Sequence, residues 1–160
     1  MSKSVILPGS YDPVTVGHLN VVKEALAIYD RVFVVAFINP EKKYLFTPDE
    51  RLSMLRIATE GMEGVTFDYA EGLVIDYARE NGIDEILKGY RNDSDLEYER
   101  AMAEWNKKNG CIDTVFIKCK DEYARVSSTA VREALAGGRI PFELLPDGVG
   151  EFISKKTLNI

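Results

Sequence analysis

One continuously apolar run in this chain, rich in β-branched residues, reads Val32-Phe33-Val34-Val35-Ala36-Phe37-Ile38. Such a run is typical of a strand in a parallel sheet, because helices cover both faces of that strand and neither face meets water. The run is far too short to cross a bilayer. We therefore interpret it as a central strand of an α/β domain.

Strand and helix patterns alternate on both sides of this run. Upstream, a short strand over residues 4–7 precedes a helix that begins near Thr15 or Val16 and repeats apolar residues at three- and four-residue steps as far as Tyr29. Downstream, Thr47-Pro48-Asp49-Glu50 combines an N-cap residue, a proline at the first helical position and a capping-box glutamate, which predicts a second helix. The other expected elements are strands over residues 65–69, 85–88 and 114–117, helices over 73–81, 94–108 and 128–136, and a short C-terminal helical tail.

Alternating strands and helices at these spacings imply right-handed crossovers and a doubly wound parallel sheet. We expect an α/β fold and a single domain over residues 1–160. Ligands of such sheets bind at the carboxyl ends of the strands. The loops that should open onto this edge are those after Leu7, Ile38, Lys88 and Ile117.

Charge and composition limit the partners and the cellular location that we expect for this protein. The net charge of −6 argues against a general nucleic-acid binder, since affinity for phosphate backbones needs an excess of Lys and Arg. The N-terminus lacks the apolar core of a secretory signal, so we expect a cytoplasmic protein with no membrane partner. Cys111 and Cys119 are expected to be reduced thiols. No cluster of His, Cys and carboxylates has the spacing of a structural metal site, so no metal-ligating residues are predicted.

The segment from Gly9 to His18 joins the first strand to the first helix and contains the only histidine of the chain. A helix start offers unpaired backbone N–H groups and a positive dipole end, both suited to phosphate. Gly17 removes a side chain where a nucleotide could approach closely. A lone histidine is nevertheless more often a structural or surface residue.

Several separated motifs favour a functional role for this segment. Thr15-Val16-Gly17-His18 resembles the variant of the histidine-x-glycine-histidine motif of the nucleotidyltransferase superfamily that begins with threonine. With four further motifs, the whole chain resembles one family, the phosphopantetheine adenylyltransferases. The motifs are Pro8-Gly9-Ser10-Tyr11-Asp12-Pro13 through His18, Pro40-Glu41-Lys42-Lys43, Phe46-Thr47-Pro48-Asp49-Glu50-Arg51, Lys88-Gly89-Tyr90-Arg91 with Asp95-Leu96-Glu97-Tyr98-Glu99, and Val126-Ser127-Ser128-Thr129-Ala130-Val131-Arg132.

The resemblance implies a Rossmann-like nucleotidyltransferase fold and a reaction. In that reaction the adenylyl group of ATP is transferred to 4′-phosphopantetheine, giving dephospho-coenzyme A and pyrophosphate in coenzyme A biosynthesis. It also implies Mg²⁺ that arrives with ATP, a homohexamer and feedback by coenzyme A. Two alternatives stay open: the same adenylyl transfer to another phosphorylated acceptor such as nicotinamide mononucleotide, and a module that senses a nucleotide without turnover.

The resemblance assigns roles to individual residues. Ser10, His18 and Lys42 are the expected catalytic residues, and Lys42 would bind the acceptor phosphate. Ser10, Lys42, Val74 and Lys88 are expected to contact the acceptor. The expected ATP-binding set is Ser10, Tyr11, His18, Gly89, Tyr90, Arg91, Glu99, Tyr123, Ala124, Arg125, Val126, Ser127, Ser128 and Thr129.

Plainer roles compete with these assignments. Lys42 could be a solvated loop lysine, Glu99 an exposed helical glutamate, and the hydroxyls of residues 127–129 simple helix caps. The chain also departs from the family pattern at two positions. Lys88 stands where arginine is usual, so the bidentate fork is lost while the charge is kept. Ser10 stands where threonine is common.

Overall fold

The computed structural model describes residues 2–157. Residue 1 of the expected domain, and residues 158–160 at the end of its expected helical tail, lie outside the described residues. Five parallel strands form one sheet in the order β3-β2-β1-β4-β5. The α/β, doubly wound fold class is therefore confirmed. The strands are β1 (Ser4–Gly9), β2 (Arg31–Ile38), β3 (Val65–Glu71), β4 (Glu85–Tyr90) and β5 (Asp113–Lys118).

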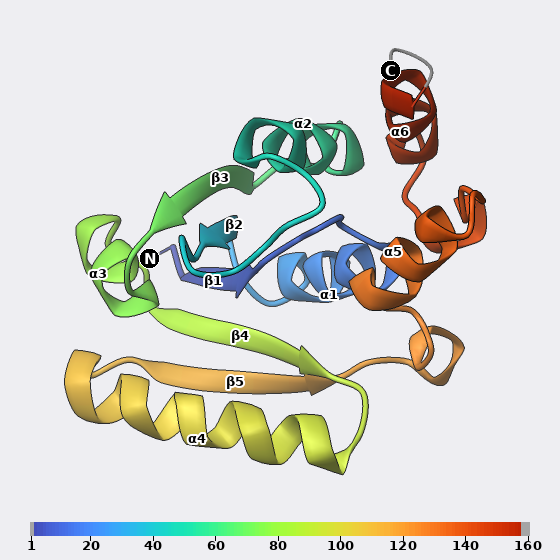
Figure 1. Cartoon of the computed structure of the whole chain (residues 1–160). Helices are drawn as coiled ribbons and strands as arrows, with labels where there is room; N and C mark the ends of the chain where they lie inside the picture. The colour runs from blue at the N-terminus through green and yellow to red at the C-terminus, as the bar shows by residue number, and fades with distance from the viewer. Residues whose placement is uncertain (1, 158–160) are drawn as a thin grey trace.

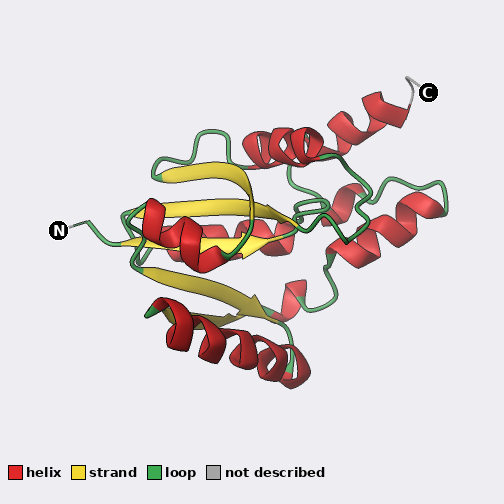
Figure 2. Ribbon diagram, turned by 60° about the vertical axis from the view of Figure 1, so that its left-hand side comes forward, coloured by secondary structure: helices red, strands yellow, loops and turns green. Residues whose placement is uncertain are grey.

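Helices cover both faces of this sheet (Figures 1 and 2). Residues of β2 alternate between two cores: Val32, Val34 and Ala36 join one buried cluster, while Phe33 and Val35 join the other. This alternation explains why the run is apolar at every position. The α-helices are α1 (Val16–Leu26), α2 (Pro48–Ala58), α3 (Val74–Glu80), α4 (Asp93–Gly110), α5 (Ser128–Ala136) and α6 (Val149–Thr157).

The two cores use different helices. Side chains of α1, α2, α5 and α6 pack into the first cluster, and Ile75 and Ala78 of α3 pack into the second. Helix α4 runs alongside β5 (Figure 1) and contributes no fully buried residue. Within residues 2–157, no helix is both long enough and apolar enough to cross a membrane.

The strands at the centre of the sheet extend further than predicted. β1 continues to Gly9, which pairs with Ala36, and β4 continues to Tyr90, which pairs with Lys118. Pro8 and Gly9 do not interrupt the ladder, because they pair with Val35 and Ala36 of β2, and Gly89 of β4 likewise pairs with Ile117 of β5. Lys88 therefore lies within β4 instead of at its last residue.

Predicted helix starts agree closely with the structure. The capping box at α2 is confirmed: the N–H of Glu50 donates to Thr47 Oγ1 at 3.1 Å, and the Glu50 carboxylate accepts from the N–H of Thr47 at 2.9 Å. The helix through Tyr29 was predicted too long. α1 ends at Leu26, and Tyr29 packs into the core from the following turn.

β1 is the point where the sheet changes direction of winding, since β2 lies on one side of it and β4 on the other. Ligands of doubly wound sheets bind at such a switch point, outside the carboxyl ends of the strands. β4 approaches α1 very closely there. A Cβ added to Gly89 would lie 2.9 Å from Val21 Cγ2.

We expect Gly89→Ala to lower the free energy of unfolding by about 1–3 kcal/mol, the usual cost of overpacking a tight contact. Urea denaturation should show most of this loss disappearing in a Val21→Ala background, where the clashing methyl group is gone. Gly137→Ala is a matched control, because its added Cβ would meet only ordinary contacts of 3.5 Å or more. Equal losses in both backgrounds would show that the contact with Val21 is not the cause.

Candidate active site

Two cavities adjoin at the carboxyl ends of β1 and β4. The first cavity has a volume of about 330 Å³ and the second about 210 Å³. Their walls share Pro8, Gly9, Lys88 and Glu99. Molecules held in the two cavities would therefore meet beside the end of β1.

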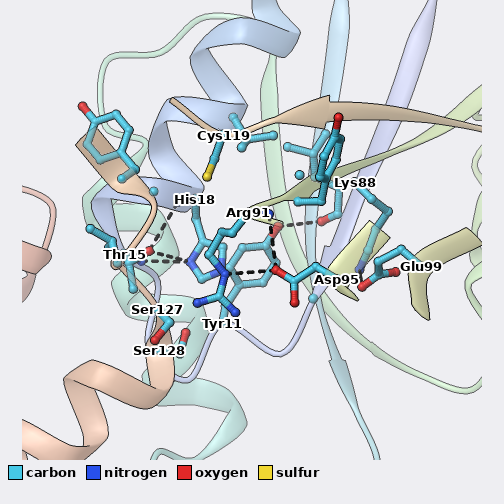
Figure 3. A pocket seen from close by; sticks show the side chains of 18 of the residues that line it. Tyr11, Thr15, His18, Lys88, Arg91, Asp95, Glu99, Cys119, Ser127 and Ser128 are labelled. Carbon is cyan, nitrogen blue, oxygen red and sulfur yellow. Dashed lines mark hydrogen bonds and ion pairs between the residues drawn. The ribbon is translucent and has the colours of Figure 1, made fainter. Parts of the chain in front are cut away.

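The first cavity is built to receive an anion. Lys88 and Arg91 supply positive charge from the end of β4, and the starts of α1 and α5 meet at the same wall (Figure 3). Among the α-helices in residues 2–157, α1 and α5 are the two whose first turns carry no acidic residue. Their positive dipole ends are therefore not neutralised by side chains and are available to phosphate.

His18 occupies the third position of α1 and completes a capping box with Thr15. Its Nδ1 accepts a hydrogen bond from the backbone N–H of Thr15 at 3.0 Å. Burial, and then the charges of Lys88 and Arg91, lower the pKa of His18 to about 4. The imidazole is thus neutral at pH 7, and since Nδ1 is an acceptor, Nε2 carries the proton.

Tyr11 packs against His18 at the wall of the first cavity. Its ring meets the imidazole edge-on, with 4.8 Å between the ring centroids, and its hydroxyl donates to the carbonyl oxygen of Leu7 at 2.8 Å. The hydroxyl is therefore engaged within the protein. Tyr11 supports His18, and its phenol oxygen is not free to meet a ligand.

Ser10 and Lys42 come together although 32 residues separate them in the chain. Lys42 Nζ donates to Ser10 Oγ at 3.4 Å. Ser10 lines the second cavity, whereas Lys42 is exposed and belongs to neither lining. The ammonium group thus lies at the rim of the second cavity, next to its junction with the first.

Helix α4 places carboxylates beside Lys88 of β4 and beside Arg91, which follows this strand (Figure 3). Lys88 Nζ donates to the carbonyl oxygen of Pro8 at 3.3 Å and lies 3.5 Å from Glu99 Oε1. Arg91 Nε lies 3.2 Å from Asp95 Oδ2. Each cation therefore already has an anionic partner that a phosphate would have to replace or share.

Most of the residues expected from the sequence gather here. Val74, Ser10 and Lys88 line the second cavity, while Ala124 and Arg125 are exposed and lie outside both linings. The expected residues that line the first cavity are Tyr11, His18, Lys88, Gly89, Tyr90, Arg91, Glu99, Tyr123, Val126, Ser127, Ser128 and Thr129.

Sequence reasoning missed the residues of α4 that complete the second cavity. Met102, Ala103 and Asn106 line it together with Glu99. Their spacing of three, four and seven residues from Glu99 places them on one helical face. That spacing was the signal that could have found them. Thr15, Asp95 and Cys119 in the first cavity were also missed.

Comparison with known proteins decides the family. A model of cytidylyltransferase-like proteins matches residues 6–134. The phosphopantetheine adenylyltransferase of Symbiobacterium thermophilum is 44% identical over 142 residues, covering 88% of each chain. That of Corynebacterium diphtheriae is 39% identical over 97% of this chain and 98% of its own. The enzyme of that name from Caldanaerobacter subterraneus subsp. tengcongensis is 38% identical over 94% and 95%.

This chain belongs to the phosphopantetheine adenylyltransferase family. The resemblance found in the sequence motifs is thereby confirmed, and the chain is a nucleotidyltransferase. A bifunctional NMN adenylyltransferase/ADP ribose pyrophosphatase from Francisella tularensis matches with a TM-score of 0.71 and 18% identity. This chain covers 49% of that one and is itself covered over 97%, so the likeness shows a shared fold alone.

We expect this adenylyltransferase to lose stability in mild acid because of His18. The folded pKa of about 4 lies below the ordinary value of 6.5, so between these values the unfolded chain binds more protons than the folded one. Stability conferred by the neutral ring is complete above pH 6.5 and falls as the pH drops. The loss attributable to His18 between pH 7 and pH 5 is about 2 kcal/mol.

Urea denaturation of the wild type and of His18→Gln at pH 7, 6 and 5 measures this loss. Glutamine at this position can keep the capping-box bond without titrating. The difference in unfolding free energy between the two proteins should therefore shift steadily against the wild type as the pH falls. A constant difference would mean that the ring titrates alike in both states.

Proposed function

We propose that this chain transfers the adenylyl group of ATP to 4′-phosphopantetheine, releasing pyrophosphate and forming dephospho-coenzyme A. The observation that carries the proposal is the shared wall of the two cavities: Lys88 belongs to this wall, the neutral His18 lines the first cavity, and Lys42 contacts Ser10 at the rim of the second. The names of the relatives support the identity of both substrates.

The chemistry needs no nucleophile from the protein. An oxygen of the acceptor phosphate attacks the α-phosphorus of ATP, the bond from that phosphorus to the bridging oxygen of the β-phosphate breaks, and pyrophosphate leaves. The acceptor phosphate is largely ionised near neutral pH, since its second pKa is about 6. Positioning and charge stabilisation therefore account for most of the catalysis.

His18 acts as a neutral hydrogen-bond donor in this scheme. Its Nδ1 is occupied by the N–H of Thr15, so the Nε2–H group is the one left to donate to an α-phosphate oxygen. A histidine with a pKa near 4 does not bring a positive charge of its own at pH 7. The cations that balance the triphosphate are Lys88 and Arg91, assisted by the helix start at residues 127–129.

Lys42 and Ser10 orient the acceptor phosphate across the junction. The pantetheine arm would lie in the second cavity, where Phe37, Val74 and Met102 offer an apolar lining. Adenosine would lie in the first cavity among the remaining expected residues: Tyr11, Gly89, Tyr90, Glu99, Tyr123, Ala124, Arg125 and Val126. Of these, Ala124 and Arg125 would need to act from outside the lining.

Mg²⁺ is proposed to enter with ATP. Within residues 2–157, no three His, Cys, Asp or Glu side chains are grouped to hold a metal ion. The carboxylates nearest to the proposed phosphates, Asp95 and Glu99, are already paired with Arg91 and Lys88. Phosphate oxygens and water are ligands that Mg²⁺ prefers, and the bound ion would neutralise charge on the leaving pyrophosphate.

We also propose a cytoplasmic homohexamer that is subject to feedback by coenzyme A. An exposed apolar stripe on α4 supports self-association, with Tyr98, Met102 and Trp105 exposed by 69%, 51% and 47%. Coenzyme A resembles the proposed product in both its pantetheine and its adenosine parts, so it could occupy both cavities. Sedimentation of the purified protein tests the assembly.

A panel of acceptors tests the reaction. Purified protein is given ATP and Mg²⁺ with 4′-phosphopantetheine, with nicotinamide mononucleotide, or with no acceptor, and released pyrophosphate is measured. We expect stoichiometric release with 4′-phosphopantetheine alone. Release with nicotinamide mononucleotide would identify that molecule as an acceptor instead. ATP binding without pyrophosphate release under any of the three conditions would favour the nucleotide-sensing alternative.

Lys42→Ala should raise the KM for 4′-phosphopantetheine by about tenfold to a hundredfold, the scale of one hydrogen bond to a charged group. ATP titration should be nearly unchanged, because Lys42 lies outside the first cavity. Lys43→Ala is the matched control, since the neighbouring lysine is also exposed. Equal losses for both substrates would remove the acceptor role from Lys42.

His18→Ala should lower turnover by roughly a hundredfold to a thousandfold, the usual effect of one transition-state donor, while the protein still folds and binds ATP. Half of the capping box is lost as well, at a cost of about 1 kcal/mol. Circular dichroism, ATP titration and pyrophosphate release on one preparation separate these effects. Near-normal turnover in the folded variant would reduce His18 to its capping role.

A further inference from the structure

Arg51 of α2 is a fully buried cation with few partners. Its side chain is 0% exposed, and Nη1 donates to the carbonyl oxygen of Ser10 at 3.0 Å. Nε and Nη2 have no hydrogen-bond partner, and no carboxylate within residues 2–157 pairs with the guanidinium. Such burial is costly for a charged group, so stability alone does not account for an arginine here.

The guanidinium of Arg51 contacts both segments that carry the Ser10–Lys42 pair. On one side it holds the backbone of Ser10, whose hydroxyl accepts from Lys42 Nζ. On the other side its guanidinium carbon lies 4.0 Å from the centroid of the Tyr44 ring. Tyr44 follows Lys42 by two residues, and Lys42 Nζ lies 5.6 Å from the same ring.

Tyr44 is itself tied to the loop that carries Lys42. Its hydroxyl oxygen accepts from the N–H of Asn39 at 2.9 Å and donates to the carbonyl oxygen of Phe37 at 3.5 Å. These two hydrogen bonds therefore fix the ring on which Arg51 stacks to the segment from the end of β2 to Tyr44. Planar stacking and a rigid fork of N–H donors are properties of arginine that lysine lacks.

We infer that Arg51 is a positioning residue that sets Lys42 against Ser10, and so places the ammonium group on the acceptor phosphate. The guanidinium joins the Ser10 backbone to the Tyr44 ring and acts on the acceptor through Lys42 without touching it. This inference rests on the proposed adenylyl transfer for the identity of the acceptor. It is independent of which residues bind ATP.

The test uses full-length Arg51→Met, which replaces the buried charge by an apolar side chain. We expect the KM for 4′-phosphopantetheine to rise by about tenfold to a hundredfold, the scale of a misplaced catalytic group, while the ATP dissociation constant stays close to the wild-type value. Arg56→Met is the matched control on the same helix, because Arg56 is exposed. It should leave both substrates unaffected.

A double-mutant cycle separates positioning from general damage. If Arg51 acts through Lys42, then Arg51→Met in a Lys42→Ala background should weaken acceptor use little further. Two losses that multiply in the double variant would overturn the inference. An equal loss for ATP and acceptor in the folded single variant would overturn it as well.

A second variant covers the case in which Arg51→Met does not fold. Tyr44→Leu removes the stacking ring and should give the same selective rise in the acceptor KM, and an acceptor KM at the wild-type value would contradict the inference. Exposed Tyr69→Leu is its control. The wild-type enzyme reports separately on the reaction: absent pyrophosphate release would reject the proposed function, whereas normal release with unselective variants would reject only the role of Arg51.

Discussion

Hydrogen bonding of three backbone carbonyl groups in the loop after β1 is the constraint on which the site depends. The carbonyl oxygen of Ser10 accepts from Arg51, that of Asp12 from Arg132, and that of Pro13 from Ser128. Those three donors come from α2 and α5, which lie far along the chain. These three hydrogen bonds tie the loop after β1 to α2 and α5.

The same loop organises its neighbours in return. The buried carboxylate of Asp12 accepts from the backbone N–H groups of Leu45 at 2.8 Å and Phe46 at 2.9 Å, which anchors the segment after Lys42. Tyr11, in the left-handed region with φ 48°, turns its ring under His18. The positions of Lys42 and His18, the proposed acceptor lysine and α-phosphate donor, thus both depend on one stretch of backbone.

Much of the architecture could be predicted because its causes are local. The run at residues 32–38 and the capping box at Thr47 and Glu50 depend on neighbours in sequence, and both have the expected structure. His18 as a capping-box partner was not predicted, because that motif normally carries Glu or Gln at this position. The ring's protonation also depends on burial and on Lys88 and Arg91, which only the fold brings near.

The contacts within the site could not be derived from pattern at all. Ser10 meets Lys42 across 32 residues, Arg51 across 41, and Asp12 meets Arg132 across 120. No periodicity spans such distances, and the resemblance between motifs supplied their association without its geometry. It assigned a ligand role to Tyr11 but did not predict that the Tyr11 hydroxyl donates to the carbonyl oxygen of Leu7, and it assigned no role to Arg51.

Lysine at position 88 fits the electrostatic balance of this junction. Its ammonium group is shared between the Pro8 carbonyl and Glu99, at 3.3 and 3.5 Å, and neither contact has the geometry of a planar fork. A compact charge on a flexible stem can keep the carbonyl contact while it turns from a carboxylate to a phosphate. In a chain with a net charge of −6, attraction for two polyanionic substrates has to be local. The α4 carboxylates Glu99 and Asp95 offset the positive charges of Lys88 and Arg91, and in the proposed reaction phosphates would take over these pairings. Lysine at position 88 keeps the charge that such an exchange of partners needs.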